Sequence, residues 1–252
     1  MTDSPDFKQK LKQKQPLIGT VQELASAEVT EILVGAGFDW IWMDMEHSAI
    51  DVPCMQRMLQ AGQHLCTCIV RSPSHDEVWI KKILDAGADG IILPLVNSAE
   101  EAEKIIQFCK YPPEGRRSVG LARAHGYGMS FQKYIDDANQ TISIILQIEH
   151  IDAVNNIEAI VKVPGIDALI IGPYDLSGSM GKIGQTNDPE VQEQIEKVRQ
   201  TCLNANMPMG IFTANPEEVK TLIKKGYCLI AVGIDTMLMG KAVKEAIEIS
   251  RQ

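Results

Sequence analysis

Short apolar runs alternate with longer helical patterns along this chain, and that alternation limits the fold more than any other feature. The runs are apolar throughout rather than at every second residue, which is typical of strands buried on both faces. No hairpin signal joins one run to the next, so the pattern predicts parallel strands connected by helices. The eight runs cover residues 17–20, 40–44, 67–71, 90–95, 142–149, 168–172, 209–213 and 229–233.

Turn and capping signals between the runs indicate the same repeating unit. Ser98 and Glu101 form a capping box, which predicts a helix that continues through Lys110. A glycine also stands shortly before four of the runs, where it can adopt the left-handed conformation that ends a helix. These glycines are Gly37, Gly87, Gly165 and Gly226.

Eight strand–helix units in 252 residues predict an α/β protein, a (β/α)8 TIM barrel that forms a single domain over residues 1–252. The competing open, doubly wound sheet usually carries a glycine-rich phosphate loop after its first strand, and residues 19–23 are not such a loop. Phe7 and Leu11 lie four residues apart among lysines, which predicts a short N-terminal helix with a solvated basic face. The long irregular stretch 112–140 predicts a lid or an interface element.

Charge and composition exclude several classes of protein. The formal net charge of -9 is unlike that of a general nucleic-acid binder, and no apolar run approaches the ~18 residues of a membrane helix. No secretory signal follows Met1, so we expect a cytoplasmic protein with neither nucleic acid nor membrane as a partner. The six cysteines lack paired CxxC spacing, so buried free thiols are expected rather than a zinc site.

The candidate site lies at the carboxyl ends of the predicted strands, because barrel enzymes carry their chemistry there. Charged side chains that meet at this rim must be paired with one another or hold a cation. In chain order, the candidate residues are Asp44, Glu46, His47, Arg71, Gln147, Glu149, Gly172, Tyr174, Asp175 and Phe212.

Glu149 and Asp175 are the candidate metal ligands. Carboxylate oxygens without nearby cysteine suit an octahedral Mg²⁺ or Mn²⁺ that keeps positions open for water and substrate. Gln147 and Glu149 are two residues apart and share a strand face, whereas His150 faces away and is discounted as a ligand. None of the eight runs contains a lysine, which disfavours an imine mechanism because a Schiff-base lysine needs a desolvated position.

Several motifs, taken in order, resemble those of the HpcH/HpaI aldolase family. They are the stretches 39–47, 70–71, 85–94, 147–149 and 172–177, within a match that runs from about residue 17 to residue 239. The resemblance implies a (β/α)8 barrel and a class II pyruvate aldolase that depends on a divalent metal. Mg²⁺ or Mn²⁺ is expected, with Co²⁺ as a further option, and no organic cofactor. The resemblance also implies a homo-oligomer, either a trimer or a hexamer.

The resemblance assigns roles to individual residues of this sequence. Glu149 and Asp175 would be the metal ligands, and His47 the acid/base group oriented by Asp85. Arg71 would stand beside the pyruvate oxygen, with Asp44 and Glu46 positioning it and the rim. The remaining expected substrate-binding residues are Gln147, Gly172, Tyr174 and Phe212, with backbone near Tyr174 holding the pyruvate carboxylate.

The expected reaction is reversible cleavage of a 4-hydroxy-2-oxo acid, such as 2,4-dihydroxyhept-2-ene-1,7-dioate, to pyruvate and an aldehyde. Met45 and Tyr174 stand where family members often have small residues, so the aldehyde preference stays open. Two alternatives remain. One is decarboxylation of oxaloacetate at the same site, and the other is a catalytically silent barrel that acts as an assembly module.

Overall fold

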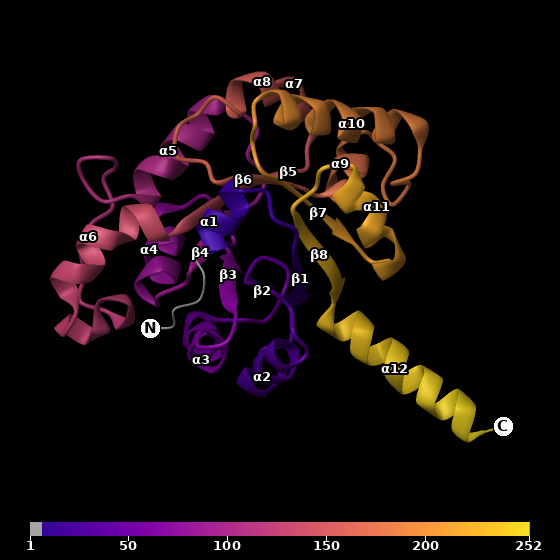
Figure 1. Cartoon of the computed structure of the whole chain (residues 1–252), viewed down its shortest axis with the longest axis horizontal. Coiled ribbons are helices and arrows are strands. Elements are labelled where there is room, and N and C mark those ends of the chain that lie inside the picture. Colours follow the sequence, from indigo (N-terminus) through magenta and orange to yellow (C-terminus); the bar gives the residue numbers. More distant parts are fainter. Residues whose placement is uncertain (1–6, 252) are drawn as a thin grey trace.

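The computed structural model describes residues 7–251 and has a closed barrel of parallel strands at its centre (Figure 1). The strands are β1 (Leu17–Gln22), β2 (Trp40–Asp44), β3 (Thr67–Arg71), β4 (Gly90–Leu93), β5 (Ser143–Ile148), β6 (Ala168–Ile171), β7 (Met209–Thr213) and β8 (Leu229–Ile234). Each strand pairs with the next, and β8 pairs with β1 to close the barrel. The predicted (β/α)8 barrel is therefore confirmed.

Helices alternate with the strands, and most of them cover the outside of the barrel. They are α1 (Phe7–Lys12), α2 (Ala27–Gly35), α3 (Val52–Gly62), α4 (Glu77–Asp85), α5 (Ala99–Cys109), α6 (Phe131–Thr141), α7 (Ile151–Asn155), α8 (Ile157–Ile160), α9 (Pro173–Ser179), α10 (Pro189–Asn204), α11 (Val219–Lys224) and α12 (Asp235–Ser250). Two short 3-10 helices, η1 (Arg123–Gly128) and η2 (Pro216–Glu218), complete the set. None of the helices in the described part of the chain is long and apolar enough to cross a membrane.

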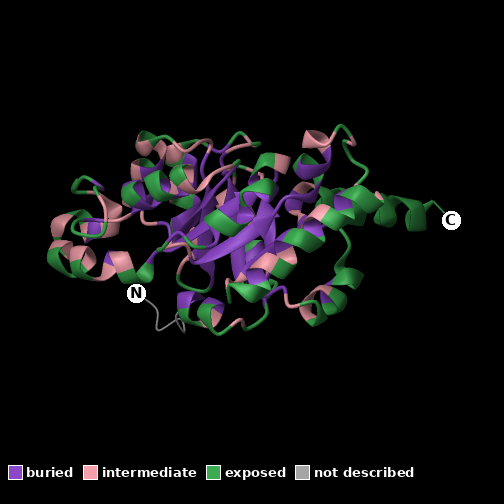
Figure 2. Cartoon of the chain, turned by 90° about the horizontal axis from the view of Figure 1, so that it is seen from above, coloured by how far each residue is buried: buried purple, intermediate pink, exposed green. Residues whose placement is uncertain are grey.

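Apolar side chains form two layers, one inside the barrel and one between the strands and the helices. Figure 2 shows the strands at the centre buried and the helices around them exposed along part of their surface. Trp40 is completely buried in the inner layer, and its indole nitrogen donates to the Leu17 carbonyl at 3.3 Å. A Cβ at Gly19 would lie 2.5 Å from the Trp40 ring, so only glycine lets these two strands pack at this level. All six cysteines are buried and free, as expected.

The turns that lead into β2, β4 and β6 share one hydrogen-bonding pattern. In each turn an aspartate follows a glycine with positive φ, and its carboxylate accepts a backbone N–H from the preceding strand. The donors are Ile18, Cys68 and Ile144, at 2.8, 2.8 and 2.9 Å from Asp39, Asp89 and Asp167. Before β8, Cys228 takes the aspartate's place and its thiol contacts the Met209 carbonyl. The repeated helix-to-strand turn is therefore confirmed, and its side chains fasten the amino ends of the strands.

Helix α1 packs at the amino end of the barrel, where Phe7 and Leu11 join the inner apolar layer. The expected solvated face is wrong for Lys8, which is buried. Its ammonium lies 3.0 Å from Asp167 and donates to the Ile142 carbonyl at 2.7 Å. The charge is tolerated there because a carboxylate and a carbonyl replace the lost water.

The stretch between β4 and β5 differs from the sequence prediction. Strand β4 ends at Leu93, since Pro94 cannot donate to a neighbouring strand and Leu95 has a φ of 51°. Residues 112–140 are not irregular throughout, because they contain η1 and most of α6. Polar residues on the exposed face of α6 hid its amphipathic pattern in the sequence.

Candidate active site

Arg71 and Asp44 form the centre of the charged rim. They are the last residues of β3 and β2 and are paired in register, so their side chains leave the barrel together. The Arg71 guanidinium donates to both carboxylate oxygens of Asp44, with Nε–Oδ1 at 2.9 Å and Nη2–Oδ2 at 2.5 Å. The ring of Trp42 lies 5.0 Å from the guanidinium carbon, and Nη1 is 3.2 Å from Glu46. Arg71 is therefore a fixed cation held on three sides.

Burial and charge set the protonation of these groups. Burial alone would lower the pKa of Arg71, but the hydrogen bonds and charge of Asp44, together with Glu46, raise it. Burial raises the pKa of Glu46, although Arg71 and His47 pull it down. The buried Glu46 oxygen is the one that forms the ion pair with Arg71, and no donor among the described residues makes a well-directed hydrogen bond to it. The rim thus holds Arg71 as a permanent cation beside Glu46, a carboxyl group whose ionisation is disfavoured by burial.

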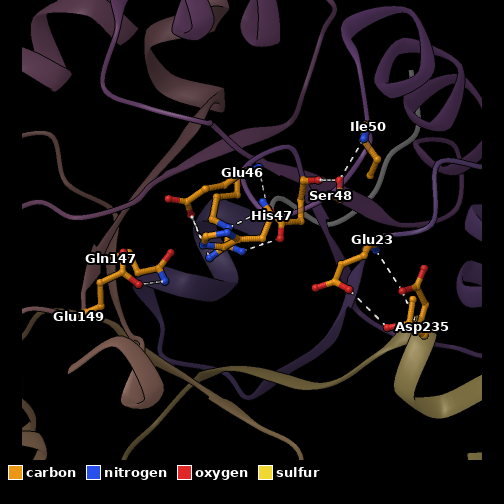
Figure 3. Close-up of polar contacts among 11 residues, drawn as sticks. Glu23, Glu46, His47, Ser48, Ile50, Gln147, Glu149 and Asp235 are labelled. Atoms are coloured by element: carbon orange, nitrogen blue, oxygen red, sulfur yellow. Dashed lines mark hydrogen bonds and ion pairs between the residues drawn. The ribbon is translucent and has the colours of Figure 1, made fainter. Parts of the chain in front are cut away.

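His47 stands on the turn between β2 and α3, with its side chain 63% exposed. Asp44 shapes this turn, because its Oδ1 accepts the backbone N–H groups of Glu46 and His47 at 2.9 and 3.3 Å. The ring nitrogen Nε2 lies 3.6 Å from a Glu46 oxygen (Figure 3). His47 is therefore at the open mouth of the site, where an incoming substrate can reach it.

Asp85 does not meet His47 within the chain. It is the last residue of α4, which starts beside the carboxyl end of β3 and runs back toward the amino end of β4. Its carboxylate instead accepts from Arg117 at 2.7 Å, and Arg117 is buried against the rings of Tyr111 and Tyr134. The expectation that Asp85 orients His47 is not met in a single chain, because a helix of nine residues carries Asp85 about 13 Å away from the rim.

Gln147 and Glu149 leave β5 on the same face, and the Gln147 amide contacts the Glu149 carboxylate. The other Glu149 oxygen accepts the backbone N–H of Leu95 at 2.8 Å. A Cβ at Gly172 would lie 2.7 Å from the Glu149 carboxylate, so glycine at this position makes room for it. The pKa of Glu149 is raised to about 7, chiefly by burial; the charges of Asp175 and Glu46 add to this rise, and the Leu95 N–H and Arg71 oppose it.

Asp175 lies in the first turn of α9, directly after β6, and its charge acts on both Glu149 and Glu46. Tyr174 beside it is 54% exposed and stands at the mouth of the site. Phe212 is half-buried on β7 and packs against the inner apolar layer. These residues therefore border the same rim as Arg71.

The donor set fits a hard divalent cation. A buried carboxylate with a raised pKa, Glu149, lies within range of Asp175, and the Gln147 carbonyl oxygen is buried without a donor. Within residues 7–251, no three His, Cys, Asp or Glu side chains converge as a metal cluster. Two carboxylates with few further protein ligands suit Mg²⁺ or Mn²⁺, which fill their remaining positions with water and substrate oxygens.

Two contributors to the site were missed in the sequence. Leu95 holds Glu149 through its backbone N–H while its own backbone is left-handed, and only the preceding proline hinted at an unusual turn. Glu23 reaches the same rim from the end of β1, and its charge acts together with those of Asp44 and Arg71. Its position just after a predicted strand was the available signal.

The chain matches the family described as HpcH/HpaI aldolase/citrate lyase over residues 19–242. A 4-hydroxy-2-oxo-heptane-1,7-dioate aldolase from Klebsiella pneumoniae is 39% identical over 241 residues, which cover 94% of this chain and 91% of that protein. A 2-dehydro-3,6-dideoxy-6-sulfogluconate aldolase from Pseudomonas putida is 40% identical over 237 residues and 92% of each chain.

Comparison with a solved structure indicates the same family. An HpcH/HpaI aldolase/citrate lyase family protein from Burkholderia cenocepacia superposes with a TM-score of 0.94 at 30% identity, covering 97% of this chain and 98% of that chain. Sequence and fold agree over nearly the whole length. The chain therefore belongs to the HpcH/HpaI aldolase/citrate lyase family.

Proposed function

We propose that the chain is a metal-dependent class II pyruvate aldolase that cleaves a 4-hydroxy-2-oxo acid reversibly to pyruvate and an aldehyde. The observation that carries the proposal is the presence, at one rim, of the buried carboxylate of Glu149, of exposed Asp175 whose charge acts on it, and of the fixed cation Arg71. Glu149 and Asp175 would hold Mg²⁺ or Mn²⁺, with Co²⁺ as a further option, beside Gln147. When bound, the cation supplies Lewis-acid polarisation of the 2-oxo acid.

The side chains of this chain carry the rest of the reaction. In the cleavage direction His47 accepts the proton of the 4-hydroxyl group, the C3–C4 bond breaks, and the aldehyde carbonyl forms. The electron pair of that bond becomes the enolate of pyruvate, whose developing negative oxygen faces the Arg71 guanidinium. A proton added at C3 then completes pyruvate. The backbone near Tyr174 and Asp175 would bind the pyruvate carboxylate.

Exchange of the pyruvate methyl protons in deuterated water tests this proposal without any aldehyde. We expect exchange, followed by proton NMR, in the presence of Mn²⁺ and its loss on chelation, since enolate formation needs the cation. Oxaloacetate decarboxylation, which forms the same enolate, is assayed beside aldol cleavage to separate these two activities. The absence of metal-dependent exchange would instead favour a catalytically silent assembly module.

We also propose that the protein works as a homo-oligomer, a trimer or hexamer, in which α12 packs against a second copy. Figure 1 shows α12 extending away from the barrel, and Asp235 is the one buried residue in its described length. Apolar side chains are exposed along it: Met237, Leu238, Met239, Val243, Ile247 and Ile249. Because α12 extends away, it does not cover the side of the barrel formed by β8 and β1. The α12 helix of a second copy has the length and the apolar residues needed to cover that side.

A double substitution, Val243→Asp with Ile247→Asp, is expected to lower the molecular mass measured by light scattering after size exclusion. Both side chains are exposed in the single chain, at 63% and 46%, so the change should leave the barrel folded. Lys241→Asp on the same helix is the matched control and should keep the oligomer. An unchanged mass in the double variant would contradict the role of α12 in assembly.

A further inference from the structure

Glu23 is an acid at the rim that the reaction described above does not use. It directly follows the last residue of β1. One of its carboxylate oxygens meets the Thr236 hydroxyl group, and the other points toward the side of the view on which Glu46 and His47 lie (Figure 3). The charges of Asp44 and Arg71 both act on it. Glu23 therefore belongs to the wall of the site, opposite the proposed metal ligands.

The chain fixes the position of Glu23 from several directions. Asp235 accepts the backbone N–H groups of Glu23 and Leu24 at 3.1 and 2.9 Å. The buried side chain of Gln22 donates to the carbonyls of Leu24 and Ser26 at 3.1 and 2.9 Å. One Glu23 oxygen also accepts from the hydroxyl group of Thr236 at 3.3 Å. These contacts fix the backbone from which the Glu23 side chain leaves, and the Thr236 hydroxyl group holds one of its carboxylate oxygens.

The electrostatic surroundings of Glu23 are acidic. Burial raises its pKa first, and the neighbouring charges of Asp44 and Asp235 raise it further, while Thr236 and Arg71 oppose them. The acids at this wall already repel one another, and another anion brought beside them would meet the same repulsion.

The rim offers no free permanent cation to a second anionic group, within the part of the chain that the structure describes. Arg71 is occupied by Asp44 and Glu46. In the loops that lead from each strand to its next helix, including the α9–α10 loop, the one lysine is Lys182. Its ammonium is held by Asp188 at 2.7 Å and Glu190 at 2.9 Å.

We infer that Glu23 is a specificity-determining residue that directs the enzyme to uncharged aldehydes and against aldehydes that carry a carboxylate or a sulfonate. This inference rests on the aldolase function proposed above. The 2-oxo acid end has its own recognition by Arg71 and the proposed cation, whereas the distal end of the substrate meets Glu23. A neutral alkyl or hydroxylated tail is tolerated beside Glu23 and can pack on exposed Leu95 and Tyr174, whereas an anionic tail is rejected.

The experiment compares cleavage of 4-hydroxy-2-oxoheptanoate with that of 4-hydroxy-2-oxoheptane-1,7-dioate, which differ only in the distal carboxylate. For the unmodified protein we expect a higher kcat/KM with the monoacid. Glu23→Gln should shift the ratio of the two kcat/KM values toward the diacid on the order of tenfold, because one like charge is removed from the wall. Glu23→Asp, which keeps the charge, should retain most of the preference for the monoacid.

Glu31→Gln is the matched control, because it removes the same charge from the exposed surface of α2. The ratio of its two kcat/KM values should equal that of the unmodified protein. This ratio is insensitive to partial misfolding, because misfolding lowers both kcat/KM values by the same factor. A preference for the diacid in the unmodified protein, or an unchanged ratio in Glu23→Gln, would overturn the inference. Failure of metal-dependent pyruvate exchange would instead overturn the aldolase proposal, so the two failures are distinguishable.

Discussion

Glu149→Gln is expected to lower metal-dependent aldol turnover by at least about a thousandfold, because a Lewis-acid cation contributes several kcal/mol that this ligand secures. Asp175→Asn should have a similar effect. Both changes keep the size of the side chain, so neither opens a cavity. The measurement is turnover as a function of Mn²⁺ concentration, together with direct Mn²⁺ binding followed by electron paramagnetic resonance.

Thermal stability should separate loss of the metal site from loss of the fold. The pKa of Glu149 is raised from 4.5 to about 7, mainly by burial, so in the metal-free protein the ionised form disfavours the folded state. Because the pKa of Glu149 is raised in the folded state, the free energy of unfolding falls as the pH rises through about 7. Glu149→Gln removes this fall, since glutamine does not ionise. Metal-free Glu149→Gln should therefore unfold at the same or a higher temperature above pH 7.

Asp152→Asn is a control near the same strand, since Asp152 is 64% exposed and, among residues 7–251, its carboxylate forms an ion pair with His150 alone. It should keep normal turnover and normal Mn²⁺ binding. Near-normal metal-dependent turnover in either Glu149→Gln or Asp175→Asn would show that these carboxylates do not hold the cation.

His47→Ala and Arg71→Ala should differ in which activities they lose. Removal of a general base typically costs 10²–10⁴-fold, and loss of an oxyanion partner costs about 10²–10³-fold. Arg71 faces the enolate oxygen that forms in both reactions, so its removal should damage aldol cleavage and oxaloacetate decarboxylation alike. His47 is needed where a hydroxyl proton moves, so His47→Ala should retain a measurable share of decarboxylation.

Both variants are assayed on both substrates at saturating Mn²⁺, with circular dichroism to check folding. Arg71→Ala leaves Asp44 and Glu46 without their cation, so a fall in stability of roughly 3–5 kcal/mol accompanies its loss of activity. His64→Ala, at an exposed histidine in the turn that leads into β3 and away from the rim, controls for His47. Equal loss of both activities in His47→Ala would show that His47 acts on the enolate and does not transfer the hydroxyl proton.

The barrel could be predicted from the sequence because its signals are local. Apolar runs, the capping box at Ser98 and the glycines such as Gly37 and Gly165 each act within a few residues, and their repetition allows one closed topology. The rim residues on β2, β3 and β5 followed from the same pattern, since parallel strands place their carboxyl ends together.

Contacts between distant segments could not be predicted in this way. Lys8 is buried only because Asp167 lies across the barrel end from it, more than a hundred residues along the chain. The resemblance places Asp85 beside His47, whereas within one chain the direction of α4 carries Asp85 toward the amino end of the barrel. The left-handed backbone of Leu95 depends on its N–H meeting Glu149, which no local pattern records.

The aspartate turns at the amino ends of the strands have a consequence for laboratory evolution of this enzyme. Asp39, Asp89 and Asp167 secure the scaffold at the end opposite the rim, so the groups that stabilise the barrel and those that would choose the aldehyde are physically separate. Libraries that randomise Glu23 and Tyr174 together should therefore retain a large folded fraction. Altered aldehyde selectivity can then be screened without first adding stabilising mutations elsewhere.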